Sequence, residues 1–217
     1  MSDAPPMRVV LATANPGKLR EVQTLLAGSG LEVLPQSQFD IEAPAETGLT
    51  FVENAILKAR HAAARSGLPA IADDSGLEVD ALGGRPGVLS ARFAGPDASD
   101  ADNIARLLEE LRGVPDAVRT ARYRCIVVLM RTATDPAPLI CEGVWEGRIA
   151  TAPAGERGFG YDPLFRVGDL ALTAAQLSPE LKNSLSHRGQ ALRQLAALLE
   201  GARSGVSGIL SRSARFP

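Results

Sequence analysis

Residues 9–12 form an unbroken apolar run, Val-Val-Leu-Ala, near the start of the chain. A strand without polar alternation is typical of α/β proteins, in which helices cover both faces of the sheet. A polar turn at residues 13–18 follows at once, and after it Leu19, Val22 and Leu26 recur at helical spacing. A buried strand that leads directly into an amphipathic helix predicts an α/β fold.

The order of the remaining elements predicts a mixed β-sheet with helices on both faces. The expected elements are a helix capped by Thr50, a short strand at 70–72, a helix capped by Ser99, a hairpin of strands 119–130 and 139–149, a strand at 164–167 and a last helix at 187–200. We expect residues 1–200 to form one domain, and residues 201–217, which are rich in Ser, Gly and Arg, to be a mobile tail.

Composition and charge exclude several classes of protein. The formal net charge of −2 gives no global basic field to hold a nucleic-acid backbone, so we expect no nucleic-acid partner. No apolar run approaches the roughly 20 residues that span a bilayer, so we expect no membrane partner. Cys125 and Cys141 lack the spacing of a metal motif and predict a cytoplasmic protein with reduced thiols.

The turn at residues 13–18 has the form of a phosphate cradle. Free N–H groups and the positive dipole end at the start of a helix favour a bound anion. The residues expected to contribute are Thr13, Ala14, Asn15, Pro16, Gly17 and Lys18. An ordinary strand–helix turn with a surface lysine explains this motif equally well when it is taken alone.

Two adjacent carboxylates, Asp73 and Asp74, directly follow the expected strand at 70–72. Open α/β sheets bind ligands at the carboxyl ends of strands, where two like charges are unfavourable unless a cation relieves them. Magnesium suits so sparse a set, because it binds one or two carboxylates together with substrate phosphates. An Asx turn at Asp74 is the structural alternative. Glu46 is a further candidate ligand, whereas a capping box already explains Glu53.

A glycine-rich loop carries aromatic side chains that could stack on a purine, which is worth about 1–3 kcal/mol per base. Cationic side chains follow downstream, and they pair with a carbonyl at purine C6 but not with an amino group there. The residues of this expected base pocket are Phe159, Gly160, Tyr161, Asp162, Lys182, His187 and Arg188. The alternatives are that the aromatics anchor the loop on the core and that His187 is structural.

The segments 83–87 and 90–92 are rich in glycine, proline and arginine. We expect them to form a rigid loop or a subunit contact, with support of the Asp73-Asp74 segment or contact with phosphates as the alternatives.

Six segments resemble the inosine triphosphate pyrophosphatase family, whose members are also called XTP/dITP diphosphatases or non-standard purine NTP pyrophosphatases. They are residues 13–18 (Thr-Ala-Asn-Pro-Gly-Lys), 46–48 (Glu-Thr-Gly), 51–55 (Phe-Val-Glu-Asn-Ala), 72–77 (Ala-Asp-Asp-Ser-Gly-Leu), 159–163 (Phe-Gly-Tyr-Asp-Pro) and 186–188 (Ser-His-Arg). Each motif alone is weak, but six in the order of the family are highly specific, and the resemblance covers residues 9–199.

The resemblance implies an elongated mixed sheet between two lobes, an active site in the central cleft, and a homodimer. It implies hydrolysis of ITP, dITP and XTP to nucleoside monophosphate and pyrophosphate, with Mg²⁺ as cofactor. It also implies that Asp74 is the catalytic base, that Glu46 and Asp74 lie near the metal, and that Ser75 contacts the substrate. By the same resemblance, residues 13–18 hold the triphosphate and the base pocket holds the purine.

Two other functions stay open from the sequence. One is a nucleotide phosphatase or pyrophosphatase of different specificity, and the other is a nucleotide sensor without catalytic activity. The carboxylate pair at residues 73–74 counts against the sensor, because a pure phosphate binder gains nothing from adjacent anions.

Overall fold

The structure, a computed structural model, describes residues 5–204. The strands are β1 (Met7–Leu11), β2 (Leu31–Pro35), β3 (Ala70–Val79), β4 (Thr120–Met130), β5 (Leu139–Ile149) and β6 (Phe165–Val167). The α-helices are α1 (Pro16–Leu25), α2 (Phe51–Ser66), α3 (Asp100–Glu110), α4 (Pro179–Leu185) and α5 (His187–Ser204). Short 3-10 helices are η1 (Gln36–Phe39), η2 (Asp80–Leu82), η3 (Gly87–Arg92), η4 (Asp116–Val118), η5 (Gly168–Leu170) and η6 (Ala174–Gln176). None of the helices among residues 5–204 has the length and apolarity needed to cross a membrane.

The strands form one mixed sheet in the order β2-β1-β3-β4-β5-β6. β1 pairs in parallel with β2 and β3, and the remaining neighbours are antiparallel, with β4 and β5 joined as the expected hairpin. The predicted α/β fold with a mixed sheet is confirmed.

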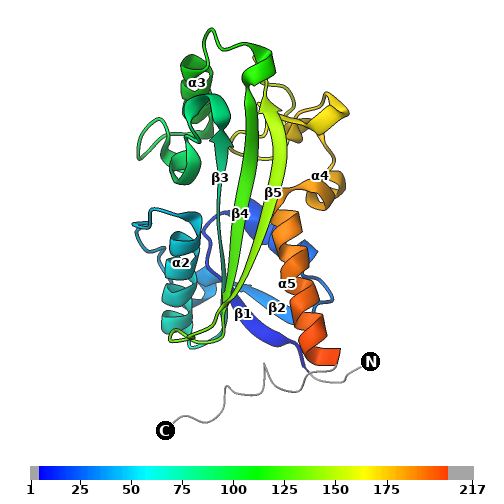
Figure 1. The fold of residues 1–217 in the computed structure, drawn as a ribbon. Coiled ribbons are helices and arrows are strands. Elements are labelled where there is room, and N and C mark those ends of the chain that lie inside the picture. Colours follow the sequence, from blue (N-terminus) through cyan, green and yellow to red (C-terminus); the bar gives the residue numbers. More distant parts are fainter. Residues whose placement is uncertain (1–4, 205–217) are drawn as a thin grey trace.

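The long strands β3, β4 and β5 run through both halves of the molecule (Figure 1). In the lower half, α2 covers one face of the sheet and α5 covers the other. α2 packs small side chains such as Ala55, Ala59 and Ala62 on the sheet, whereas α1 and α5 cover the opposite face with Val22, Leu192 and their neighbours. In the upper half a third apolar cluster forms beneath α3.

The starts of two helices follow from their caps. The Thr50 hydroxyl accepts from the Glu53 N–H at 3.3 Å, and the Glu53 carboxylate accepts from the Thr50 N–H at 2.9 Å, so the predicted capping box is present. Ser99 and Asp102 form the same reciprocal pair at the start of α3. These bonds satisfy backbone donors that a helix start otherwise leaves free.

Strand β3 does not end before the carboxylate pair, so the expectation of a strand end or Asx turn at Asp73 and Asp74 is wrong. β3 continues to Val79, and each of its residues faces a partner on β4, with Asp73 opposite Val127. The long partner strand supplies ladder hydrogen bonds throughout, which a local turn would forfeit. Because side chains alternate along a strand, the two carboxylates point to opposite faces of the sheet.

The last helix is longer than expected. α5 continues to Ser204, four residues beyond the predicted end at Glu200, so residues 201–204 are helical rather than part of a tail. A glycine such as Gly201 costs a helix about 1 kcal/mol relative to alanine, which the buried side chains Leu195 and Leu199 offset by packing on the sheet. Residues 205–217, for which mobility was expected, lie outside the described residues.

Gly143 sets how closely α5 approaches β5. A Cβ atom at this position would overlap the carbonyl oxygen of His187 and lie 3.0 Å from the backbone nitrogen of Ala191. Gly143→Ala should therefore lower the free energy of unfolding by about 1–3 kcal/mol, as overpacking does. Urea denaturation measures the change. Gly201→Ala is the control, because nothing lies within 4 Å of its added Cβ; equal stability of the two variants would contradict this packing.

Candidate active site

The first turn of α1 caps itself. Asn15 is the N-cap residue, and its Oδ1 accepts from the Gly17 N–H at 2.8 Å and the Lys18 N–H at 3.2 Å. Pro16 occupies the first helical position, where no N–H is needed. The Thr13 hydroxyl accepts from the Asn15 N–H at 3.2 Å. Two donors of the expected phosphate cradle are thus held by the Asn15 side chain, which an incoming anion would have to displace.

Asp73 binds two cationic side chains, Lys18 and Arg188, on the α5 face of the sheet. Its Oδ2 accepts from Lys18 Nζ at 2.9 Å and from Nε and Nη2 of Arg188 at 3.2 Å each. Burial alone would raise the pKa of Asp73, but Lys18, Arg188 and the more distant Lys58 hold that pKa far below its usual range. Ser75 lies on the same face, where its hydroxyl accepts from Arg188 at 3.1 Å. The surrounding cations therefore favour the ionised form of Asp73.

Asp74 lies on the α2 face in a different environment. Its Oδ1 accepts from Lys58 Nζ at 2.7 Å, and its Oδ2 has a long contact of 3.4 Å with the Asn54 amide. Burial raises the pKa of Asp74, and the nearby negative charge of Glu46 raises it further against the opposing attraction of Lys58. A carboxylate with a raised pKa is a better proton acceptor than an ordinary aspartate. The surroundings thus lower the pKa of Asp73 and raise the pKa of Asp74.

The turn at residues 13–18 lies beside Asp73 of β3. The pairing of β1 with β3 stops at Leu11 and Ile71, so β3 extends past β1 and the turn at 13–18 lies beside this step. Lys18 reaches Asp73 from that turn. The turn expected to form the phosphate cradle therefore meets one carboxylate of the pair, Asp73, at the carboxyl end of β1.

Glu46 and Asp74 converge on one ammonium group. Lys58 Nζ lies 2.8 Å from Glu46 Oε1 and 2.7 Å from Asp74 Oδ1. Among residues 5–204 no group of three or more His, Cys, Asp or Glu side chains is placed to hold a metal ion. Two carboxylates that share one cation still fit magnesium, because this ion is commonly bound by one or two carboxylates together with phosphate oxygens and water. Glu53 binds the backbone of Leu49 and Thr50 instead, as its capping role predicts.

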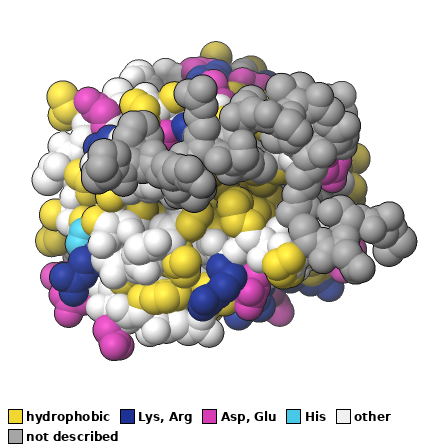
Figure 2. All heavy atoms as spheres, turned by 90° about the horizontal axis from the view of Figure 1, so that it is seen from below, with side chains coloured by type: hydrophobic (Ala, Val, Ile, Leu, Met, Phe, Trp, Pro, Cys, Tyr) yellow, Lys and Arg dark blue, Asp and Glu magenta, His cyan; other side chains and the backbone are white. Residues whose placement is uncertain are grey.

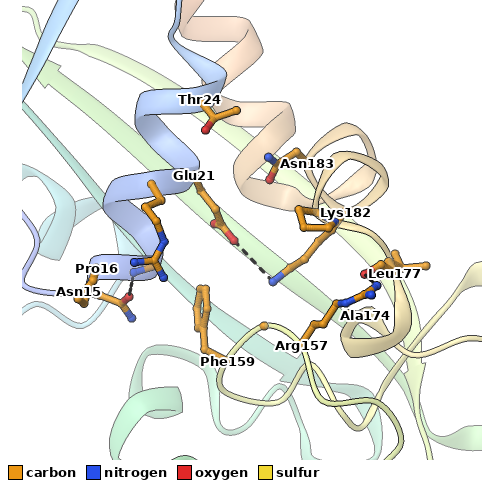
Figure 3. A pocket seen from close by; sticks show the side chains of 14 residues that line it. Asn15, Pro16, Glu21, Thr24, Arg157, Phe159, Ala174, Leu177, Lys182 and Asn183 are labelled. Atoms are coloured by element: carbon orange, nitrogen blue, oxygen red, sulfur yellow. Dashed lines mark hydrogen bonds and ion pairs between the residues drawn. The ribbon is translucent and has the colours of Figure 1, made fainter.

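A cavity of about 570 Å³ lies between α1, the loop before β6, and α4 (Figure 3). Its lining includes the predicted residues Asn15, Pro16, Gly17, Phe159 and Lys182. The cavity therefore joins the start of α1 to part of the expected base pocket.

The Phe159 ring is the aromatic group that borders this cavity. Lys182 Nζ lies 4.8 Å and the Arg188 guanidinium carbon 5.5 Å from the ring centroid. Asp162 orients the same loop, since its Oδ2 accepts from Lys182 Nζ at 2.5 Å and from the Phe159 N–H at 3.0 Å. The backbone N–H of Gly160 is bound by Asp100 at 2.6 Å. One aromatic face and two cations thus stand together beside the cavity.

Tyr161 and His187, both expected in the base pocket, lie in the core. The Tyr161 hydroxyl donates to the carbonyl of Ser90 at 2.8 Å, so this ring anchors the loop. The His187 ring stacks on Tyr123 at a centroid distance of 4.6 Å. Burial, and then the charges of Arg188 and Lys182, hold the pKa of His187 well below its usual value, which keeps the imidazole neutral. Both placements fit the structural alternatives that the sequence left open.

Sequence reasoning missed Lys58 and Glu21. Lys58 lies on the inward side of α2 between Ala55 and Ala62, and a lysine within an apolar helical stripe was the signal that could have identified it. Glu21 lies one turn after Lys18, and its carboxylate pairs with Arg188 at 2.6 Å and Lys182 at 3.6 Å. No comparable pattern marks Glu21 in the sequence.

Comparison with known proteins shows the family to which the chain belongs. The model of the Ham1 family matches residues 9–198. The chain belongs to the Ham1 family. Relatives include the dITP/XTP pyrophosphatase of Vibrio parahaemolyticus, which is 58% identical over 88% of this chain and 96% of the relative, and that of Thioalkalivibrio sulfidiphilus, which is 58% identical over 90% of this chain and 100% of the relative.

Solved Ham1 structures share the fold. The HAM1 protein from Coxiella burnetii is 52% identical and superposes with a TM-score of 0.85, over 90% of this chain and 100% of that chain. The Mycobacterium abscessus protein, described as a nucleoside-triphosphatase / dITP/XTP pyrophosphatase, is 44% identical, with a TM-score of 0.70 over 88% and 97% of the two chains. The six motifs that resembled the pyrophosphatase family therefore identified the family correctly.

Asp73→Asn should destabilise the protein strongly. The change leaves the buried guanidinium of Arg188 with one carboxylate fewer, and breaking a buried ion pair typically costs about 3–5 kcal/mol. Because the pKa of Asp73 is lowered on folding, its contribution is present at neutral pH and is lost as the pH falls below 3.8. Urea denaturation at several pH values measures both effects.

Asp80→Asn is the matched control, since Asp80 makes an exposed ion pair with Arg122. It should change the free energy of unfolding little. Equal losses in the two variants, or a loss in Asp73→Asn that persists unchanged into acid, would show that the ionised form of Asp73 does not stabilise the fold.

Proposed function

We propose that this chain hydrolyses non-standard purine nucleoside triphosphates, ITP, dITP and XTP, to nucleoside monophosphate and pyrophosphate. The observation that carries the proposal is the buried Asp74, whose raised pKa and convergence with Glu46 suit it to accept a proton beside a metal-bound phosphate. Membership of the Ham1 family and the names of its relatives support the substrate class.

The carboxylate of Asp74 removes a proton from the attacking water. Its Oδ2 is the better placed oxygen, because its contact with Asn54 is long whereas Oδ1 is held by Lys58. Lys58 keeps this carboxylate oriented and ionised before the reaction. Lys18 lies at the start of α1, where it and the helix dipole favour the negative charge of the triphosphate.

Magnesium, when bound, would neutralise charge on the phosphates and on the leaving pyrophosphate. Glu46 and Asp74 are the residues that would hold it, with the phosphates completing the coordination.

Lys182 and Arg188 would read the base, with Phe159 stacking on it. Both cations are hydrogen-bond donors only, so they can donate to the carbonyl oxygen at purine C6 but cannot pair with an amino group there. A site whose donors need a keto oxygen can discriminate by up to about 10⁴–10⁵ against a ligand that lacks it. In the free protein these donors are bound to Asp162, Asp73 and Glu21, which keeps them satisfied.

We also propose a cytoplasmic homodimer. The family resemblance supports the homodimer, and the free, buried cysteines Cys125 and Cys141 support the cytoplasmic location.

Pyrophosphate release from ITP, XTP, GTP and ATP tests the proposed function. ITP and XTP should be turned over much faster than ATP, because ATP carries an amino group at C6. Release of orthophosphate would identify a phosphatase, and survival of ITP with magnesium would identify a nucleotide sensor; either result would end the proposal. ATP turned over as fast as ITP would end the account of base recognition.

Asp74→Asn should lower kcat on ITP by about 10²–10⁴-fold, which is the usual contribution of a general base. Nucleotide affinity, measured by calorimetry with calcium in place of magnesium, should change much less. In the wild type, kcat/KM should fall on the acid side as Asp74 is protonated, at a pH above the ordinary aspartate value of 3.8. Full turnover in the variant would remove Asp74 from the mechanism.

Glu46→Gln should raise the magnesium concentration that gives half-maximal activity by at least about 10-fold, since even loss of an outer-shell partner costs about 10–100-fold in metal affinity. Glu42→Gln, an exposed glutamate of the same loop, is the control. An unchanged magnesium requirement in Glu46→Gln would exclude Glu46 as a ligand.

A further inference from the structure

Arg92 reaches the carboxylates from the upper half of the molecule. It is the last residue of η3, which lies in that half beside α3 (Figure 1). Its Nη1 lies 3.2 Å from Oε2 of Glu46, which belongs to the loop before α2 in the lower half. Lys58 holds the other oxygen of Glu46 at 2.8 Å. Each oxygen of this carboxylate therefore faces one cation.

The four side chains form a balanced set of charges. Glu46 and Asp74 carry two negative charges, and Lys58 and Arg92 carry two positive charges. This set binds a free divalent cation weakly, because the two positive side chains repel the cation that the carboxylates attract. It binds a free polyphosphate weakly for the converse reason, because the two carboxylates repel the phosphates. A metal–triphosphate complex meets no such conflict, since its metal can take the carboxylates while its phosphates take the two cations.

We propose that Arg92 is a substrate-binding residue, an inference that rests on the proposed function. When the metal–nucleotide complex binds, the Arg92 side chain breaks its ion pair with Glu46 and binds the triphosphate. The exchange gives the carboxylate of Glu46 to the metal and the guanidinium of Arg92 to phosphate oxygens. Arg92 then links η3 of the upper half to a ligand held by the lower half.

Two features of Arg92 suit this role. A guanidinium binds phosphate with two parallel hydrogen bonds, which a lysine does not. Its side chain is 32% exposed, so it can move, whereas that of Arg188 is 3% exposed and held by Asp73 and Glu21. Segment 90–92 was expected to be a rigid loop or a subunit contact, and the ion pair with Glu46 is what favours a phosphate contact instead.

Arg92→Met tests the exchange without relying on turnover. Removing a cation from Glu46 should tighten Mn²⁺ binding to the nucleotide-free protein by about threefold or more, measured by the paramagnetic resonance of free Mn²⁺. Removing a charged phosphate contact should weaken binding of metal-free ITP in EDTA by about 10–100-fold, measured by calorimetry. A merely structural role would not move the two affinities in opposite directions.

Two variants serve as controls. Arg92→Lys keeps the positive charge, so its Mn²⁺ affinity should stay near the wild type and its loss of ITP affinity should be smaller than in Arg92→Met. Arg85→Met removes an upper-half arginine that pairs with Glu110 at 2.7 Å, and it should change neither affinity.

The proposed role of Arg92 would be overturned if Arg92→Met bound Mn²⁺ and metal-free ITP with unchanged affinity, or bound both more weakly than the wild type. Pyrophosphate release by the wild type is measured in the same preparations, which separates the two proposals. If the wild type releases none from ITP, the proposed function fails. If it does release pyrophosphate while Arg92→Met binds both ligands like the wild type, the Arg92 proposal fails alone.

Discussion

The structure depends on the alternation of side chains at Asp73 and Asp74 in the middle of β3. Neighbouring strand residues point to opposite faces of the sheet, so two carboxylates that are adjacent in sequence meet different partners. Asp73 faces Lys18 and Arg188, which lower its pKa. Asp74 faces Lys58 and Glu46, and its pKa is raised. The helices on the two faces thus shift the pKa values of two adjacent aspartates in opposite directions.

The two aspartates are also the points at which elements far apart in the sequence meet. Arg188 lies in the first turn of α5, the last helix, yet it is bound to Asp73 in the central strand and to Glu21 in the first helix. Lys58 likewise joins α2 to β3 through Asp74. Charged side chains buried at this depth require partners, so the helices that cover the sheet are also the elements that set the electrostatics of the site.

Local patterns predicted much of the fold. The apolar run at 9–12, the capping boxes at Thr50 and Ser99 and the alternation in the β4–β5 hairpin are signals carried within a few residues of each other. The end of β3 was mispredicted because Asp73-Asp74-Ser75-Gly76 reads as a turn, whereas the partner strand β4 decides its conformation. Ladder pairing between residues 42 to 60 positions apart has no local signature.

For the site, the sequence indicated the residue types but not their partners. Glu46 and Asp74 converge on Lys58, whereas Lys18 reaches Asp73, the other carboxylate of the pair. Tyr161 and His187 were expected at the base but pack in the core, because a glycine-rich loop does not reveal which of its rings faces inward. Lys58 and Arg92 were not assigned to the carboxylates, since both contacts depend on how α2 and η3 approach β3.

Titration of the aspartate carboxyl carbons by NMR tests the central contrast most directly. In the wild-type protein labelled at aspartate Cγ, and assigned with Asp73→Asn and Asp74→Asn, Asp73 should stay ionised over the whole pH range in which the protein is folded. Asp74 should titrate above the ordinary aspartate value of 3.8. Titration of Asp73 at or above the pKa of Asp74 would contradict the account.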